Sequence, residues 1–514
     1  MASDELEGAQ LRQLSPPFVL AVDVGTSSAR AALFDATGRE VEGTLARVER
    51  EFRTTPDGGA ELNADAAIED VTRTVDASLA QAEARGLNVE AVAVSCFWHS
   101  LVGIDRDGRA LTPLYGWADT RAANQVSELR RRFDERATHA RTGCRFHPSY
   151  WPAKLLWLQR EQPDTFGRVA RWQTFGELLL SRLCGEQSAS VSLASGTGLL
   201  DVRRCVWDDE LLNGLQLSID RMPPLAKDGA AFALDGAYAA RWPQLRGRAV
   251  WFPAIGDGAL NNIGAGCVNQ RSVALMIGTS GAMRVLYTGE PPAALPESLW
   301  CYRADRRRVV VGGALSDGGG LYDWMKESLR LAADDDETLE REMSQMEPDA
   351  QGLIVLPFWA GERSTHWNAH ASGAIMGMTT HTRPLDILRA SLEAVAYRFA
   401  VIADALLPLA AAPEAEIRAS GGALWASRLW SQMLADVLGR PLKLSNVPEA
   451  SSRGAALLAL EALGVVDHLA ADAPIEAAEI FEPNMQRHTI YRGALERQET
   501  IYRRLHSTNG ETGK

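Results

Sequence analysis

The chain has 514 residues, more than one hydrophobic core usually organises, so we expect two large domains. Its 53 basic and 66 acidic residues give a net charge of −13, and no run of lysine and arginine supplies the basic stripe that nucleic-acid binding requires. Six cysteines without zinc-ligand spacing, an acidic N-terminus and the lack of a long uncharged apolar run favour a cytoplasmic protein that neither spans a membrane nor binds zinc.

The first predicted element is a hairpin. The apolar strand "FVLAVDV" at 18–24 contains one charged residue, Asp23, and a turn "GTSS" leads into a second strand that covers 31–34. Apolar residues at helical spacing predict a helix over 65–85, and "VEAVAVSCF" at 89–97 is typical of a buried strand. Helices that alternate with buried strands predict a layered α/β fold.

Further along the chain, "PAKLLWLQREQP" at 152–163 predicts a helix that opens with proline. Beyond a stretch rich in glycine and asparagine at 254–266, "SVALMIGTSGAMRVLY" at 272–287 repeats the pattern of the first hairpin. Two copies of one hairpin predict two halves of one architecture around a common cleft. Buried strands that end in glycine-rich turns are expected at "RRVVVGGAL" and "GLIVLPFWAGER", and one helix is expected over "LWASRLWSQMLADVLG". The predicted division is 1–17 as a flexible N-terminus, 18–262 as an N-terminal domain, 263–465 as a C-terminal domain and 466–514 as a C-terminal extension.

The two hairpin turns carry the first chemical signal. Glycine, threonine and serine in a tight turn present backbone N–H groups and hydroxyls, which are donors suited to phosphate oxygens. Asp23 stands in an otherwise apolar strand, where a carboxylate is costly unless it binds something such as Mg²⁺. A plain hairpin with a hydrogen-bonded aspartate is the alternative for either copy alone, and the repetition favours the phosphate interpretation.

Asp257 stands between two glycines in "FPAIGDGALNNIGAG", after an apolar strand and before a stretch that can begin a helix. Small neighbours let a substrate approach the carboxylate, which could then accept a proton from a hydroxyl group. The alternative is that Asp257 only caps the helix.

Two more glycine pairs are predicted to form turns after strands, at Gly312-Gly313 and at Gly421-Gly422. Each would let the backbone approach a flat ligand such as an adenine or a ribose, or would instead serve close packing between strand and helix. Neither the dinucleotide-binding GxGxxG fingerprint nor a P-loop occurs at these turns.

Aromatic and polar residues gather after the strands of the N-terminal half. Trp98 and His99 follow the strand at 89–97, and "GWADTRA" contributes Trp117 and Asp119. Aromatic faces beside fixed hydrogen-bonding groups suit a polyhydroxylated substrate, although each residue alone could equally belong to the core.

Six motifs occur in one order between residues 18 and 463: "AVDVGTSSARAALFD", "GWADTRA", "FPAIGDGALNNIGAG", "ALMIGTSGAMRVL", "PFWAGERSTHWNAHASGAIMG" and "SGGALWASRLWSQMLADVLGRPL". In these motifs the chain resembles the FGGY carbohydrate kinase family. The resemblance implies an α/β fold of two ribonuclease-H-like domains, as in the actin-like ATPases, around a central cleft for ATP and sugar. It also accounts for the duplicated hairpin, because each domain of such a fold opens with one.

The resemblance implies roles for individual residues. Asp257 matches the general base and also contacts the substrate, and Asp23 matches the site of Mg²⁺. Glu362, Arg363 and His366 match a signature loop. Two interpretations of the role of these residues stay open, a buried ion pair and a contact with the substrate. The positions that match ATP contacts are Thr26, Ser27, Gly278, Thr279, Ser280, Gly312, Gly421, Gly422 and Ala423, and those that match sugar contacts are Trp98, His99, Trp117 and Asp119.

The expected activity is ATP-dependent phosphorylation of a hydroxyl on a small sugar or sugar acid. "GDGALNNIGAG" and "IGTSGAMR" are most similar to the gluconate kinase branch, so gluconate is the expected substrate. Kinases of ribulose, xylulose or erythrulose are the alternative, since bulky Phe97-Trp98 and Gly116 depart from the gluconate pattern next to the sugar pocket. An actin-like ATPase without a sugar substrate, or a silent sugar-binding regulator, is less favoured by the intact aspartates. The resemblance allows a homodimer.

Overall fold

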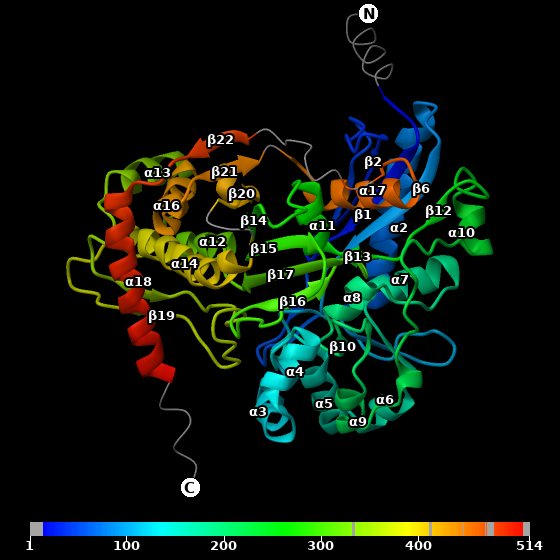
Figure 1. The fold of residues 1–514 in the computed structure, drawn as a ribbon, viewed down its shortest axis with the longest axis horizontal. Coiled ribbons are helices and arrows are strands. Elements are labelled where there is room, and N and C mark those ends of the chain that lie inside the picture. Colours follow the sequence, from blue (N-terminus) through cyan, green and yellow to red (C-terminus); the bar gives the residue numbers. More distant parts are fainter. Residues whose placement is uncertain are drawn as a thin grey trace, which may run out of the picture.

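The computed structural model describes residues 14–331, 335–410, 414–445, 447–467, 469 and 477–506. It has two halves, each built around a mixed β-sheet (Figure 1). The strand order of the first sheet is β12-β6-β1-β2-β3, with β13 also paired to β6, and that of the second is β16-β17-β15-β14-β20-β21-β22. The strands of the first sheet are β1 Phe18–Val24, β2 Ser28–Phe34, β3 Ala46–Glu49, β6 Val89–Cys96, β12 Val250–Trp251 and β13 Ile255–Gly256. The strands of the second sheet are β14 Ser272–Ile277, β15 Gly281–Thr288, β16 Trp300–Arg303, β17 Arg308–Leu315, β20 Glu416–Ser420, β21 Leu442–Ser445 and β22 Ala477–Phe481.

The two sheets repeat one topology. In the first, β1 pairs antiparallel with β2 and parallel with β6, which is parallel to β12. In the second, β14 pairs antiparallel with β15 and parallel with β20, which is parallel to β21. The predicted duplication, with one hairpin opening each ribonuclease-H-like half, is therefore confirmed. The central strands are buried on both faces, as their continuous apolar sequences predict.

Helices cover both sheets. The helix expected over 65–85 is α2 (Ala64–Ala84), which begins where the Asn63 side chain accepts a 2.9 Å hydrogen bond from the amide of Ala66. The long α14 (Pro384–Leu406) packs against β15 and β17 of the second sheet. The other helices of the second half are α12 (Gly319–Ser328), α13 (Asp336–Ser344), α15 (Gly422–Ala426), α16 (Arg428–Leu438), the short 3₁₀ turn Leu407–Leu409 and α18 (Met485–His506), with the small hairpin β18 (Ile354–Leu356) and β19 (Ala374–Met376).

A third hydrophobic cluster lies in a helical region inserted between β6 and β12 of the first half. Its long side chains include Trp151 and Trp172, both fully buried. The elements between β3 and β12 are β4 (Arg53–Thr54), β5 (Ala60–Leu62), β7 (Val102–Ile104), β8 (Leu114–Tyr115), α3 (Ala123–Arg132), α4 (Glu135–Thr142), α5 (Trp151–Glu161), α6 (Pro163–Arg168), β9 (Arg171–Gln173), α7 (Phe175–Cys184), α8 (Val191–Ser195), β10 (Leu200–Asp201), β11 (Val206–Trp207), α9 (Asp209–Gly214), the 3₁₀ turn Ile219–Arg221 and α10 (Gly236–Arg241), besides α2 and β6.

The halves are joined by two crossing helices, α11 (Asp257–Gly264) and α17 (Ala450–Ala462). A Cβ atom added to Gly264 would lie 1.8 Å from the carbonyl oxygen of Ala450, and one added to Gly454 would lie 2.0 Å from that of Leu260. The two helix backbones therefore touch directly. Figure 1 shows α17 (orange) along β1 and β6, so this helix lies between β21 and β22 of the second sheet in the sequence but completes the core of the first.

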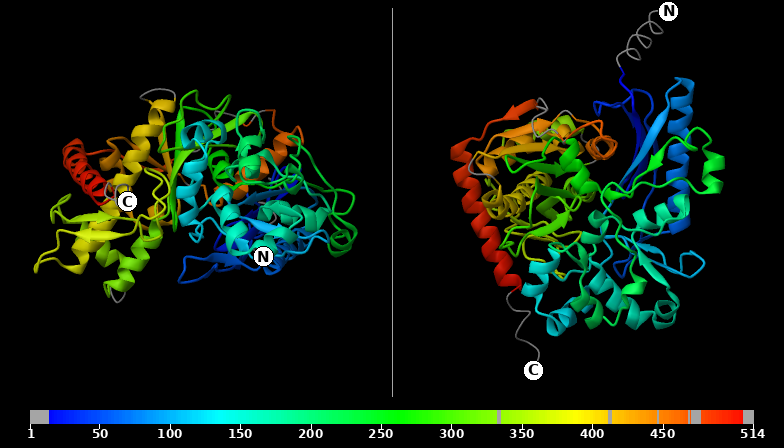
Figure 2. Two further views of the ribbon diagram at one scale, coloured as in Figure 1. Left: turned by 90° about the horizontal axis from the view of Figure 1, so that it is seen from below. Right: turned by 45° about the vertical axis from the view of Figure 1, so that its right-hand side comes forward.

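Three predicted boundaries differ from the structure. The domain division at 262/263 falls inside α11, because the helix runs on to Gly264. The expected extension from 466 belongs to the second half: β22 pairs with β21, and α18 packs against α14 and α16 on the outer side (Figure 2). The helix expected over 424–439 is split, because Ser427 leaves the helical conformation and caps α16 by accepting from the amide of Trp430. Residues 1–13, most of the N-terminus predicted to be flexible, and residues 507–514 lie outside the described residues.

Candidate active site

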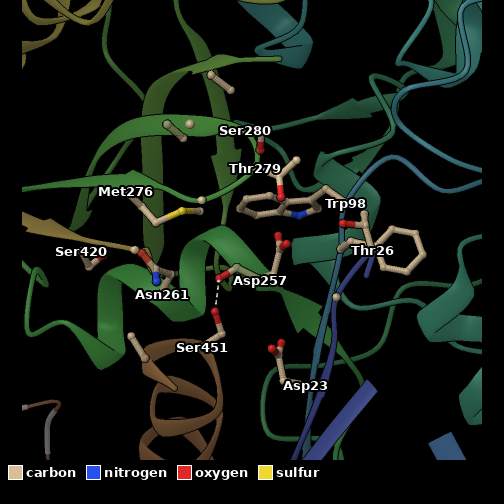
Figure 3. Close-up of a pocket in the computed structure, with 18 of the residues that line it drawn as sticks. Asp23, Thr26, Trp98, Asp257, Asn261, Met276, Thr279, Ser280, Ser420 and Ser451 are labelled. Atoms are coloured by element: carbon tan, nitrogen blue, oxygen red, sulfur yellow. Dashed lines mark hydrogen bonds between the residues drawn. The ribbon is translucent and has the colours of Figure 1, made fainter. Parts of the chain in front are cut away.

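A cavity of about 680 Å³ lies between the two halves, where both hairpin turns meet the first residues of α11 and α17. Figure 3 shows Asp257 near its centre, with Asp23 on one side and Thr279 and Ser280 on the other. The predicted residues that line it are Asp23, Thr26, Ser27, Trp98, His99, Trp117, Asp257, Gly278, Thr279, Ser280, Gly421 and Gly422.

The turn of the second hairpin is supported from below by three glycines. The amides of Gly318 and Gly320 both donate to the carbonyl oxygen of Thr279 at 3.0 Å, and the amide of Gly319 donates to that of Gly278 at 2.7 Å. A Cβ added to Gly318 would lie 2.7 Å from the carbonyl oxygen of Ser280, so side chains are excluded here. The consecutive glycines in "DGGG" are the sequence feature from which this contact with the hairpin turn could have been predicted, but it was not predicted.

Asp257 is the first residue of α11, and its carboxylate faces the cavity. Its Oδ1 accepts a 2.7 Å hydrogen bond from the amide of Gly258, and the Ser451 hydroxyl donates to its main-chain carbonyl at 3.4 Å. Burial raises the pKa of Asp257, and the nearby Arg284 guanidinium is the main influence that lowers it. The N-cap position itself is taken by Gly256, so capping does not account for the carboxylate.

Asp23 is also buried, at the end of β1. Among the described residues its Oδ1 has no hydrogen-bond partner, and burial raises its pKa to about 6. An unpartnered buried carboxylate oxygen that faces a cavity suits a divalent cation. Beside it, Arg30 of β2 forms a 2.8 Å ion pair with Glu449, which lies just before α17.

The aromatic end of the cavity is formed by the residues that follow β6. The Trp98 indole donates to the carbonyl oxygen of Ser192 at 3.0 Å. His99 has a left-handed backbone (φ 70°), and its Nδ1 lies 2.5 Å from the carbonyl oxygen of Gly196. Burial, followed by the positive charge of Arg363, holds the pKa of His99 well below its usual range, so this imidazole is neutral at physiological pH.

Sequence profiles of the FGGY family of carbohydrate kinases match both halves, the N-terminal-domain profile over residues 18–243 and the C-terminal-domain profile over residues 273–463. The chain belongs to the FGGY carbohydrate kinases. Members of this family transfer phosphate from ATP, and the chain is accordingly an ATP-dependent carbohydrate kinase. Among its described residues, no helix has the length and apolarity that crossing a membrane would take.

Several characterised kinases resemble this chain over most of its length. It is 26% identical over 459 residues to the gluconokinase of Bacillus subtilis (strain 168), with 88% of each chain covered. It is 29% identical over 428 residues to the xylulose kinase of Escherichia coli (strain K12), with 81% of this chain and 85% of the relative covered. The crystal structure of gluconate kinase from Lactobacillus acidophilus matches with a TM-score of 0.85 at 25% identity, over 96% of this chain and 99% of that one.

The kinase differs from the sequence expectation at the first glycine pair. Gly312 and Gly313 lie inside β17, which continues to Leu315, so no turn forms and neither residue lines the cavity. A Cβ added to Gly312 would lie 2.5 Å from the carbonyl oxygen of Met283, and one added to Gly313 would lie 2.7 Å from Ile402 of α14. Gly313 therefore serves close packing between strand and helix, the alternative stated above, and Gly312 serves close packing between neighbouring strands.

The second glycine pair does form the expected turn. Gly421 has φ +104°, and a Cβ there would lie 2.2 Å from the carbonyl oxygen of Ile277. Gly421 and Gly422 line the cavity, whereas Ala423, within α15, does not. Only glycine allows this approach of β20 to the second hairpin.

Asp119 is also separated from the cavity, although it was expected to contact the sugar. Its carboxylate forms an ion pair with Arg121 at 2.5 Å and accepts from the amide of Ala60 at 3.2 Å. Arg121 in turn binds Glu61 at 2.7 Å, so Asp119 is committed to a structural network. The arginine two residues away was the signal for this pairing.

Arg284, Trp300 and Tyr302 also line the cavity, although no role was predicted for them. Trp300 and Tyr302 alternate on β16 and stack with ring centroids 4.2 Å apart, which presents one aromatic face beside Trp98. Arg284 follows the second hairpin turn. Both hairpin turns are followed by an arginine, and this repeat was the sequence feature from which the role of Arg284 could have been predicted. Arg363 comes from the signature loop between β18 and β19.

Proposed function

We propose that this kinase transfers the γ-phosphoryl group of ATP to a hydroxyl of a small sugar acid, with gluconate as the substrate. One observation carries the proposal: the buried carboxylate of Asp257 lies in a cavity that is lined by both hairpin turns, whose donors suit phosphate groups. One end of the same cavity is lined by aromatic residues and arginine. Phosphoryl transfer needs a base and donors for the phosphates, and the same cavity offers both.

Asp257 is the proposed general base. As the substrate hydroxyl oxygen forms its bond to the γ-phosphorus, the bond from that phosphorus to the β–γ bridging oxygen breaks, ADP leaves with the bond electrons, and the hydroxyl proton passes to Asp257. Burial raises the pKa of Asp257, which makes its ionised form a stronger base than an exposed aspartate. Arg284 limits that rise.

The phosphate groups are proposed to bind the backbone and hydroxyl donors of the two turns, Thr26 and Ser27 on one side and Gly278 to Ser280 on the other. Asp23 would hold Mg²⁺, because its free carboxylate oxygen faces the same space. Such an ion, when bound, supplies positive charge that stabilises the transferring phosphoryl group.

The similarity to gluconokinases supports the choice of a sugar acid. A pentulose kinase is the second candidate, since xylulose kinases are similar to the same extent in sequence and in fold. Trp98, His99 and Trp117 would bind the carbon chain and hydroxyls of either substrate.

The test is release of ADP from Mg·ATP with gluconate, other aldonates, ribulose, xylulose, erythrulose and glycerol. Gluconate should stimulate turnover most, and Asp257→Asn should lower that stimulated rate by about 10²- to 10⁴-fold, the usual contribution of a positioned base. The matched control is Asp107→Asn, an exposed aspartate in the turn after β7 that should leave the rate unchanged. Turnover that no sugar stimulates would instead favour an actin-like ATPase, and preference for a pentulose would favour the second candidate.

A further inference from the structure

Arg363 extends from the signature loop toward the aromatic end of the cavity. Its guanidinium lies 5.0 Å from the ring centroid of Trp117, and its Nη2 lies 3.1 Å from Nε2 of His99. Both neighbours come from the first half of the chain, whereas Arg363 comes from the second, so the contact brings the halves together around one group.

The partners of Arg363 are all neutral. Nδ1 of His99 faces the Gly196 carbonyl and must carry its proton, so Nε2 accepts a hydrogen bond from the guanidinium. Trp117 contributes only a π-face. Among the described residues no carboxylate lies within ion-pair distance of Arg363, and its Nε is buried without a hydrogen-bond partner.

Other arginines of the cavity have negative charge close by. Arg30 is paired with Glu449 at 2.8 Å, whereas Arg284 and Arg363 both act on one carboxylate, since each lowers the pKa of Asp257 and Arg284 does so more strongly. Arg363 is therefore a surplus positive charge at the aromatic end. Arg363 is half-buried, and a guanidinium that is partly withdrawn from water without an anion favours a ligand that supplies one.

The loop holds Arg363 in place before any ligand arrives. The carboxylate of Glu362 accepts hydrogen bonds from Tyr502 of α18 at 2.5 Å and from Thr365 at 2.7 Å, and its main-chain carbonyl accepts from Nε2 of His147 at 2.8 Å. Glu362 thus turns away from Arg363 toward hydroxyls, so these two residues do not pair with each other. His366 pairs instead with Glu499 at 3.2 Å.

We propose that Arg363 binds the carboxylate of the sugar acid and so selects aldonates over neutral sugars. This rests on the proposed function, because it places the acceptor between Arg363 and Asp257. A planar guanidinium with unused N–H groups matches a carboxylate in geometry as well as in charge. The same chemistry would also suit a phosphoryl oxygen of ATP, so the experiment must separate the two anions.

The test compares the wild-type enzyme, Arg363→Gln and Arg363→Lys with D-gluconate and with the uncharged D-glucitol and D-xylulose. In Arg363→Gln, kcat/KM for gluconate should fall by about 10- to 100-fold, as expected for the loss of a charged hydrogen bond, while the KM for ATP stays within about twofold. Arg363→Lys should recover part of the loss, because the charge remains but the forked geometry does not. Arg109→Gln, at an exposed arginine in the turn after β7, is the matched control and should change neither constant.

Each other result overturns the proposal in a recognisable way. Unchanged use of gluconate by Arg363→Gln, or no recovery in Arg363→Lys, would show that Arg363 does not recognise the carboxylate, and the sugar-acid function would stand. A raised KM for ATP would assign the arginine to the phosphates. A wild-type enzyme that phosphorylates xylulose but no aldonate would overturn this inference together with the choice of a sugar acid.

Discussion

Two carboxylates of the cavity show how local surroundings separate chemical roles. Asp23 has a free oxygen and lies near the Arg30–Glu449 pair, whereas Asp257 lies near Arg284 and holds the amide of Gly258. Both pKa values are raised by burial, but only Asp257 has a strong positive neighbour as its main opposing influence. These surroundings support our proposal that the first carboxylate binds the cation and the second accepts the proton.

The pH dependence of the reaction should report on Asp257. A base works only when ionised, so kcat/KM for the sugar should fall as the pH drops through the raised pKa of Asp257. Arg284→Met removes the main influence that lowers this pKa, and the acidic limb of the pH profile should move to higher pH. Measurement of kcat/KM from pH 5 to 9 at saturating Mg·ATP checks this, and an acidic limb that stays in place would argue against Asp257 as the base.

At the scale of single elements, the start of α7 and the crossing of α11 and α17 each depend on one or two residues. The helix α7 begins with Thr174, whose amide donates to the Glu177 carboxylate at 2.5 Å. Glu177 is fully enclosed, and burial raises its pKa to about 7. The crossing of α11 and α17 instead depends on two glycines whose hydrogens leave room for the facing carbonyl oxygens.

Glu177→Gln should change stability in a pH-dependent way. The folded protein holds a proton on Glu177 up to about pH 7, whereas the unfolded chain loses it near the ordinary value of 4.5, so wild-type stability falls as the pH rises between these values. Glutamine keeps the capping hydrogen bond and cannot ionise, so the variant should be more stable than wild type by about 1–3 kcal/mol at pH 8 and equal to it at pH 4.5. Thermal midpoints at the two pH values measure this, and the exposed Glu51→Gln should give the same midpoint shift at both.

Gly454→Ala should separate α17 from α11. The added methyl group would lie 2.0 Å from the carbonyl oxygen of Leu260, so a backbone must move and the free energy of unfolding should fall by about 1–3 kcal/mol. Gly167→Ala in α6 is the matched control, because nothing lies within 4 Å of its new methyl group. Equal midpoints for the two variants would contradict the tight crossing.

The sequence predicted the local parts of this fold well. The hairpins, α2, β6 and the position of Asp257 follow from apolar runs bounded by glycine-rich turns, and the structure confirms them. Interactions between distant segments were out of reach: Gly312 looked like a turn because the packing of β17 against β15 was unknown. Asp119 is a different case, because its partner Arg121 is only two residues away and the pairing was overlooked. Arg363 lies 264 positions from His99, and no spacing rule joins them.

At the scale of the whole molecule, the two halves depend on each other. Most of the apolar face of α17 belongs to the first core, including Ala455, Ala456, Ala459 and Leu460. The first half, taken as residues 14–267, therefore lacks the helix that covers β1 and β6.

Expression of residues 14–267 alone should give a protein that exposes this face, aggregates and binds a hydrophobic dye. Fusion of residues 447–463 through a flexible linker, or co-expression with residues 268–514, should restore solubility because α17 is supplied again. Size-exclusion chromatography and dye fluorescence are the measurements. A monomeric, dye-free fragment would show that the first half folds without α17.

The position of α17 in the chain also determines when, during synthesis, the core of the first half can be completed. The ribosome makes α17 roughly 190 residues after β13, the last strand of the first sheet. At about 5–20 residues per second, the first half waits on the order of 10–40 s with one face of its sheet uncovered. Nascent chains of this kinase are consequently exposed to chaperones and to premature association throughout that interval, and synonymous codons that slow translation between β13 and α17 would lengthen it.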